Sequence, residues 1–210
     1  MPAEFHQLIV GLVLVVPAFL LAVSFHEFSH ALAATLLGDQ TAARQGRLSL
    51  NPLRHIDPLG VLFLIIFRIG WARPVEFDHR NFRHPRLYTV LTGLAGPAAN
   101  IFLALVLMYV HKVLLLLPLT PAAVHTVKQV FEVAAYINVM LGVFNLLPLP
   151  PLDGSHIVHI MIPQRYQYYY FVFQQYSFFV LLFVLMLPAT QRLLFLAIHS
   201  TYQFLKHIVF

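Results

Sequence analysis

The sequence feature that most constrains this chain is the run His26-Glu27-Phe28-Ser29-His30, which lies inside an apolar stretch. No residue from Leu8 to Phe25 is charged, and residues 31–37 are again almost wholly apolar. On a helix, His26 and His30 lie one turn apart on one face, so both imidazoles can reach the same metal ion. Glu27 lies beside them, where it can accept a proton from a metal-activated water. The alternative is two buried histidines beside a stray carboxylate, but in lipid an unpaired Glu costs roughly 3 kcal/mol or more.

The composition is that of a membrane protein. Of the 210 residues, 60% are hydrophobic and 10% are charged, and the mean hydropathy is +0.78. A soluble domain carries roughly 25% charged residues. We therefore predict an all-α polytopic membrane protein with about five transmembrane helices. The chain has no cysteine, which excludes disulfides and a thiolate metal site.

The apolar runs give the expected order of spans. The first, Leu8 to Leu37, would be about 45 Å long as a helix, more than the ~30 Å hydrocarbon core of a bilayer. Because the N-terminus lacks the positive region of a signal peptide, we read this run as a retained span. The second and third spans are expected at about Tyr88 to Leu117 and Lys128 to Leu147. Two further stretches, Tyr176 to Leu187 and Leu193 to Phe210, form either two spans or a hairpin.

The region between the first two spans has a different pattern. Gly46-Arg47-Leu48-Ser49-Leu50 alternates like a short strand, and Leu59 to Phe67 is too short to span as a helix. A short re-entrant β-hairpin or loop, at about residues 47–70, fits these lengths. Trp71-Ala72-Arg73-Pro74-Val75 then returns the chain to the interface, where Trp is favoured.

The charge distribution predicts the topology. The formal net charge is +5, but the positive charge is concentrated in one connecting region, which argues against a nucleic-acid partner. Eight of the 13 Lys and Arg residues lie there: Arg44, Arg47, Arg54, Arg68, Arg73, Arg80, Arg83 and Arg86. Basic loops are retained in the cytoplasm, so this side is expected to be cytoplasmic and the N-terminus external. Asp153, after the third span, then returns to the same side as the His26–His30 helix end.

Two other runs place polar groups inside apolar sequence. Ala95-Gly96-Pro97-Ala98-Ala99-Asn100 combines small residues that permit close helix contact with a buried amide, and Asn100 either orders the site or contacts it. In Asn145-Leu146-Leu147-Pro148-Leu149-Pro150-Pro151-Leu152-Asp153-Gly154, three prolines forbid a regular helix. Asp153 is therefore a carboxylate at a broken membrane segment, available as a ligand or as the N-cap of a helix that begins after it.

Two histidines from one helix and a distant carboxylate make a catalytic zinc set, with the fourth position left open for water. We thus predict one zinc ion per chain held by His26, His30 and Asp153. His156 is the rival ligand or a supporting residue around the site.

Together, His26–His30, Gly96-Pro97-x-x-Asn100 and Asn145-x-x-Pro148-x-Pro150-Pro151-Leu152-Asp153-Gly154 resemble the site-2 protease family of intramembrane zinc metalloproteases. Asn51-Pro52 through Trp71-Ala72-Arg73-Pro74-Val75 is similar to its small prokaryotic members. The resemblance covers roughly residues 8–160, the catalytic core expected within a single protease domain of residues 1–210, with C-terminal hydrophobic segments at about 166–210. It implies Asp153 as third ligand and cleavage of transmembrane helices near the cytoplasmic side of the cell (inner or plasma) membrane. The PDZ and CBS domains common in the family are absent from this sequence.

The hypothesis is metal-assisted peptide hydrolysis within or near the transmembrane helices of membrane-protein substrates. Glu27 is the expected general base. Asn145 either steadies the oxyanion or the substrate backbone, or merely supports the helix break. The main alternative is a non-proteolytic zinc-binding membrane protein that holds or escorts partners. Glu27 argues against it, because a site that only binds needs no base. A metal transporter would need ionisable residues along a path across the bilayer, whereas here they converge near one face.

Overall fold

The computed structural model describes residues 3–67, 71 and 73–210, and the described residues form helices and no strand. The α-helices are α1 (Ala3–Leu36), α2 (Thr41–Arg44), α3 (Pro58–Phe67), α4 (Pro85–Leu114), α5 (Pro121–Asn145), α6 (Ser155–Met161), α7 (Gln167–Met186) and α8 (Pro188–Val209). Short 3-10 helices lie at Pro52–Arg54, His79–Asn81 and Gln164–Tyr166.

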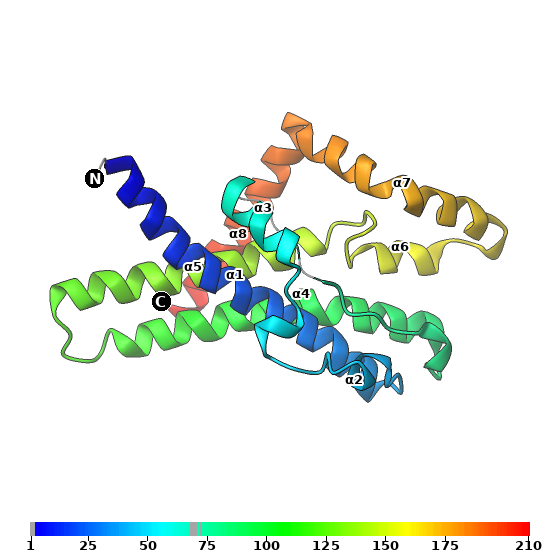
Figure 1. Cartoon of the computed structure of the whole chain (residues 1–210), viewed down its shortest axis with the longest axis horizontal. Helices are drawn as coiled ribbons and strands as arrows, with labels where there is room; N and C mark the ends of the chain where they lie inside the picture. The colour runs from blue at the N-terminus through cyan, green and yellow to red at the C-terminus, as the bar shows by residue number, and fades with distance from the viewer. Residues whose placement is uncertain (1–2, 68–70, 72) are drawn as a thin grey trace.

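Helices α1, α4 and α5 pack against one another, and α8 packs on α4 and α5 (Figure 1). Two apolar clusters lie between them. One joins α1 to α5 through Ala18, Phe19, Ala22, Val23, Ala134 and Ile137. The other joins α4, α5 and α8 through Ala104, Met108, Ala135, Val139, Ile198, Tyr202, Leu205 and Val209. Helices α6 and α7 extend toward the end of the molecule that lies opposite the two chain termini (Figure 1).

Four helical segments in the described part of the chain are long and apolar enough to cross a membrane: Gly11–Leu36, Pro85–Leu114, Pro121–Asn145 and Gln164–Met186. The chain is therefore a multi-pass membrane protein. The expected fifth span is not among them. The last hydrophobic stretch forms α8, whose sequence includes Gln191, Arg192 and Lys206. The apolar side of α8 packs in the cluster with α4 and α5.

The expected hairpin is not what the described residues form, because residues 58–67 are the helix α3. Asp57-Pro58 has the pattern of a turn in the sequence but begins a helix. The Asp57 side chain accepts hydrogen bonds from the backbone N–H groups of Leu59 (2.9 Å) and Gly60 (3.5 Å), and Pro58 occupies the first helical position. Arg68 to Gly70 and Ala72 lie outside the described residues.

The alternating run at residues 46–50 is likewise not a strand. Gly46 has φ of +69°, a left-handed conformation that ends the turn after α2, and this breaks extended backbone. Among the described residues, Ile56 is an isolated β-bridge residue, and the N–H of Arg73 donates a backbone hydrogen bond to the carbonyl of His55 (2.9 Å).

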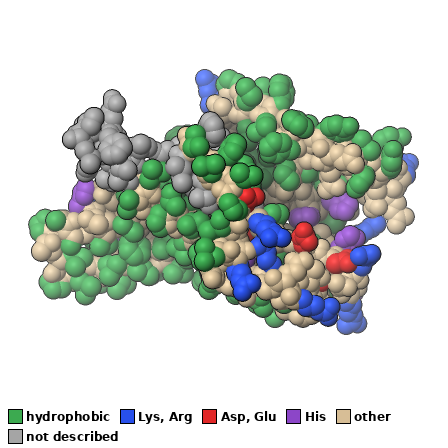
Figure 2. Space-filling view, in the orientation of Figure 1, with side chains coloured by type: hydrophobic (Ala, Val, Ile, Leu, Met, Phe, Trp, Pro, Cys, Tyr) green, Lys and Arg blue, Asp and Glu red, His purple; other side chains and the backbone are tan. Residues whose placement is uncertain are grey.

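On the visible face of the molecule, most charged side chains are concentrated in one region (Figure 2). Figure 2 shows hydrophobic side chains over much of the visible face, while Lys, Arg, Asp, Glu and His gather toward the end that contains α2. On this face (Figure 2), most of the charged side chains are therefore separated from the largest apolar area.

Candidate metal centre

Three side chains from distant parts of the chain converge at one point. His26 and His30 project from α1, and Asp153 lies in the loop between α5 and α6. Oδ2 of Asp153 is 3.0 Å from Nε2 of His26 and 3.4 Å from Nε2 of His30, and the two Nε2 atoms are 3.0 Å apart. Both histidines are buried.

The loop that carries Asp153 is fixed by Gly154. Its N–H donates to the carbonyl of Asn145 (2.7 Å), the last residue of α5. A Cβ at Gly154 would lie 2.3 Å from the carbonyl oxygen of Leu146, so a side chain cannot be accommodated there. The Asp153-Gly154 pair thus places the carboxylate next to α1 because only glycine permits so close a return of the backbone.

The proton positions on the two imidazoles are set by their partners. Nδ1 of His30 is 2.7 Å from the carbonyl of Thr92, which can only accept, so Nδ1 donates. Nδ1 of His26 is 2.5 Å from Oδ1 of Asn100. That amide is oriented by its Nδ2, which donates to the carbonyl of Ala22 (3.0 Å), so the oxygen does face His26. In the neutral rings, both Nε2 lone pairs therefore point into the site.

A second amide extends this chain of hydrogen bonds. Asn100 Nδ2 also donates to Oδ1 of Asn138 on α5 (2.9 Å), and Asn138 Nδ2 donates to the carbonyl of Ala134 (2.9 Å). Asn100 and Asn138 are both fully buried. The chain links α1, α4 and α5 and holds the His26 ring in one orientation.

The centre fits a cation. Two imidazole lone pairs and one carboxylate oxygen face each other, and among the described residues Asp153 Oδ2 has no hydrogen-bond donor. Burial alone would raise the pKa of Asp153, but the adjoining His26 and His30 rings hold it below its ordinary value, so the carboxylate is ionised. In a tetrahedral zinc site with zinc–ligand distances of ~2.0–2.1 Å, two ligand atoms lie about 3.3 Å apart. The observed separations of 3.0–3.4 Å are close to that spacing.

Two glycines of α4 make room for these rings. A Cβ at Gly96 would lie 2.3 Å from Nε2 of His30 and 2.7 Å from Nε2 of His26. A Cβ at Gly93, about one turn away, would lie 2.6 Å from Cδ2 of His156. The face of α4 against the centre is therefore bare backbone, and His156 lies next along that face from the two α1 histidines.

Glu27 is buried beside the centre. Its Oε2 accepts a hydrogen bond of 2.8 Å from the backbone N–H of Val75. No described residue donates a hydrogen bond to Oε1, so one carboxylate oxygen is left for a water molecule.

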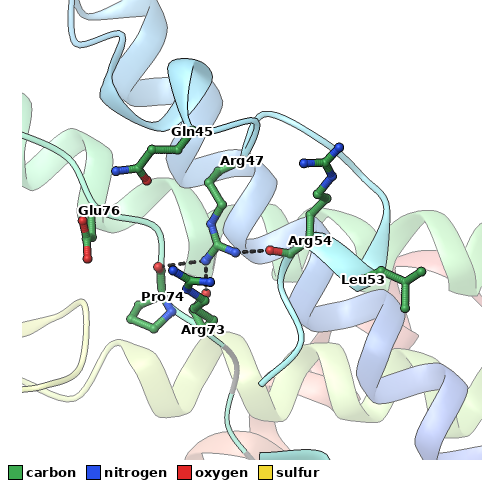
Figure 3. A pocket seen from close by; sticks show the side chains of 7 residues that line it. All are labelled: Gln45, Arg47, Leu53, Arg54, Arg73, Pro74 and Glu76. Atoms are coloured by element: carbon green, nitrogen blue, oxygen red, sulfur yellow. Dashed lines mark hydrogen bonds between the residues drawn. The ribbon is translucent and has the colours of Figure 1, made fainter. Parts of the chain in front are cut away.

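The segment that contacts Glu27 is held by Arg47. Its buried guanidinium donates to the carbonyls of Arg54 and Arg73, and to that of Pro74 at 2.9 Å (Figure 3). The carbonyls of residues 73 and 74 immediately precede the Val75 N–H. Arg47 therefore fixes the backbone that supplies the hydrogen bond to Glu27.

Two predicted site residues lie elsewhere. The Asn145 amide donates to the carbonyl of Leu141 in its own helix (3.0 Å) and is not among the groups that converge on the centre. His156 is half-buried, 5.7 Å from Phe77 between ring centroids, and is not part of the converging set either. Burial lowers the pKa of His156. For both residues, a direct role in the reaction stays a prediction.

Sequence reasoning missed Asn138, Arg47 and the backbone groups of Thr92 and Val75. A lone Asn in an apolar helix was a signal for Asn138, because a buried amide needs partners. For Arg47, the sequence indicates a basic residue in an alternating run and gives no sign of a buried contact with backbone carbonyls. Backbone partners have no side-chain signature and could not have been found.

The fold and the site together define a class of protein. It is a multi-pass helical membrane protein with a buried His–His–Asp centre and an adjacent glutamate. The model of Peptidase family M50 matches residues 110–188, a range that includes Asp153 but not α1. "Putative zinc metalloprotease YwhC" of Bacillus subtilis (strain 168) is 41% identical over 177 residues, which covers 80% of this chain and 78% of that protein. "Putative zinc metalloprotease Rip2" of Mycolicibacterium smegmatis is 30% identical over 201 residues, 91% of this chain and 74% of that protein. No solved structure matches the chain at comparable significance.

The chain belongs to peptidase family M50, the site-2 proteases, and this confirms the resemblance carried by its motifs. It is a zinc metalloprotease of the membrane.

Proposed function

We propose that this chain hydrolyses peptide bonds within or near the transmembrane helices of membrane proteins, and so performs regulated intramembrane proteolysis. One zinc ion would be held by Nε2 of His26, Nε2 of His30 and Oδ2 of Asp153. The observation that supports this most is the convergence of three acceptor atoms, without a donor between them, next to a buried glutamate and beside apolar helices.

When bound, zinc lowers the pKa of a coordinated water toward ~7 and polarises a carbonyl group. The protein's residues supply the rest. Asn100 and the Thr92 carbonyl fix the two imidazoles with their lone pairs inward. Glu27, anchored through Oε2 to Val75, uses Oε1 to take the proton of the attacking water and passes it to the leaving amine.

The substrate must present an extended backbone. Peptide bonds of a helix are hydrogen-bonded internally, so a transmembrane substrate has to unwind before attack. The described residues contain no strand whose edge could receive the unwound segment. The Asn145 amide uses one N–H to donate to the Leu141 carbonyl, so its second N–H and its Oδ1 can hold the substrate while that bond is kept.

We place the centre near the cytoplasmic side of the cell membrane, because the basic 39–87 region follows directly after the end of α1 that carries the two histidines. A single protease domain, with its catalytic core at about residues 8–160, fits this arrangement. A reporter fused within residues 76–86 should be cytoplasmic, and one inserted near Thr120 should be external. The reverse pattern would overturn the placement of the centre near the cytoplasmic side.

The activity is tested by Glu27→Gln, which deletes the base and leaves the three ligands. In detergent or proteoliposomes, hydrolysis of a helical membrane substrate should fall by roughly 10²–10⁴-fold, the scale of lost general-base catalysis. Zinc content should stay at that of the unsubstituted chain, whereas His30→Ala should lose most of it. If Glu27→Gln restores a deletion phenotype fully while His30→Ala does not, the chain is a zinc-dependent binding protein instead.

A further inference from the structure

A cavity of about 410 Å³ lies outside the metal centre, between the segments that lead into and out of α3. Its lining is mostly polar (Figure 3): Gln45, Arg47, Leu53, Arg54, Arg73, Pro74 and Glu76. Three guanidinium groups against one carboxylate give this lining a net charge of +2.

The positive charge has no counter-ion in the described part of the chain. None of Arg47, Arg54 and Arg73 forms an ion pair with a described carboxylate, and the buried Arg47 is held by carbonyl groups alone. Burial lowers the pKa of Arg47; the charges of Glu27 and Glu76 oppose this, and that of Arg73 adds to it. Uncompensated charge of this kind is costly, so an anion in the cavity would be stabilising.

The two exposed arginines, Arg54 and Arg73, lie around the buried Arg47. The Arg54 guanidinium packs over Gly46, where a Cβ would come within 3.1 Å of its Nη1. Arg73 extends beside Arg47 (Figure 3). A planar guanidinium offers paired donors that match the oxygens of a phosphate or a carboxylate and not a halide, and several guanidiniums around one cavity suit the larger number of oxygens on a phosphate group.

The surroundings of the cavity are apolar. Leu53, which lines it, is 79% exposed. The neighbouring helix α3 exposes Leu59, Leu62 and Ile66, and Trp71 is also exposed between α3 and Arg73. Exposed leucines next to an interfacial Trp indicate contact with acyl chains, which puts the arginines at headgroup depth.

We propose that this cavity binds the phosphate group of an anionic phospholipid headgroup. Arg54 and Arg73 donate to the phosphate oxygens over the buried charge of Arg47, and the acyl chains lie against Leu53 and α3. Glu76 lowers the affinity by opposing the anion.

The test is a lipid titration of the purified full chain in a neutral detergent, with bound lipids counted by native mass spectrometry. Phosphatidylglycerol should bind at one site per chain, roughly tenfold or more tighter than phosphatidylcholine with the same acyl chains. The double variant Arg54→Gln/Arg73→Gln should weaken this binding by about thirtyfold, the usual contribution of two basic residues near an anionic lipid. It keeps the backbone carbonyls that Arg47 needs.

Two matched variants separate the cavity from general surface charge. Arg44→Gln/Arg83→Gln removes the same charge from exposed residues that do not line the cavity, and should change the affinity by less than about threefold. Glu76→Gln should tighten binding by a few-fold. Equal losses in the two double variants would overturn the proposal in favour of diffuse charge.

Two other occupants are outcomes of the same test. If inorganic phosphate binds as tightly as phosphatidylglycerol and is lost in the same variant, the site takes a free anion and the lipid assignment is wrong. If lipid binding is unchanged in Arg54→Gln/Arg73→Gln but cleavage of a substrate with acidic flanking residues falls, the cavity belongs to the substrate and the proposal also fails.

Discussion

The backbone N–H of Val75 donates a 2.8 Å hydrogen bond to Oε2 of Glu27, across 48 positions of sequence. Both groups are buried. The bond joins the helix of the metal centre to the segment after α3, and Arg47 holds that segment through the carbonyls of Arg73 and Pro74. The position of the proposed base is thus set by a loop as well as by its own helix.

Arg47→Gln should lower activity without removing zinc. The shorter amide cannot reach all three carbonyls, so the Val75 N–H is no longer fixed opposite Glu27. We expect kcat/KM to fall by about 10–100-fold, as for other residues that orient catalytic groups. Zinc content by elemental analysis should match that of the exposed-site control Arg44→Gln. A loss of zinc parallel to the loss of activity would contradict the positioning role.

Asn100→Ala should weaken zinc binding before it affects anything else. The change removes the acceptor of the His26 Nδ1–H, and with it the orientation of the ring. Chelator titration should show an affinity about 10–100-fold lower, and Asn138→Ala, one bond further away, should show a smaller loss. Asn145→Ala serves as the control, since its amide donates to Leu141 and should leave zinc affinity unchanged. Equal affinities in all three variants would exclude the amide chain as an orienting device.

The candidate ligands could be predicted because their signals are local or topological. His26, Glu27 and His30 are indicated by helical spacing in an apolar run, and Asp153 by a proline-broken segment that returns to the same face. Their convergence in the folded chain has the geometry expected of a metal site. The contact of Asn138 with Asn100 could not be predicted, because it depends on how α4 and α5 cross. No periodicity in the sequence specifies that crossing.

The region between the first two spans was the part predicted least well. Asp57-Pro58 serves equally as a turn and as a helix N-terminus, and the choice depends on whether the next apolar residues pack as a helix. The alternation at residues 46–50 suggested a strand, but a strand needs a partner, and a partner is a long-range property. Local pattern therefore predicted four of the apolar spans and the residues that converge at the candidate site, but not the loop that holds Glu27.

The hydrogen bonds of Asp39 lead us to expect that the folded chain loses stability in acid. It is fully buried and accepts hydrogen bonds from Thr41, Asn81 and the N–H of Asp78. Burial alone would raise the pKa of Asp39, but these bonds outweigh it and hold the pKa below its ordinary value. The stabilisation is therefore complete above the unfolded pKa of ~3.9 and is lost as pH falls through the lower, folded pKa.

Asp39→Asn should accordingly lower the free energy of unfolding by about 1–3 kcal/mol at pH 7, and the difference from the unsubstituted chain should narrow below about pH 4. Denaturant unfolding in detergent at a series of pH values measures both. Comparing the two proteins at each pH cancels the contribution of zinc release. A difference that stays constant down to pH 3 would mean that the ionised form of Asp39 is not what the loop requires.

Gly96→Ala tests the centre from the side of α4. The added methyl group would lie 2.3 Å from Nε2 of His30 and 2.6 Å from Cε1 of His26, so both rings must move. Zinc affinity should fall on the order of 100-fold, and activity with it. Gly93→Ala is the matched control, because its methyl group meets Cδ2 of His156 instead. Both changes favour the helix by up to ~1 kcal/mol, so neither variant should lose α4 for lack of propensity. Full zinc affinity in Gly96→Ala would refute the assignment of His26 and His30, and a loss in Gly93→Ala equal to that in Gly96→Ala would make His156 a ligand.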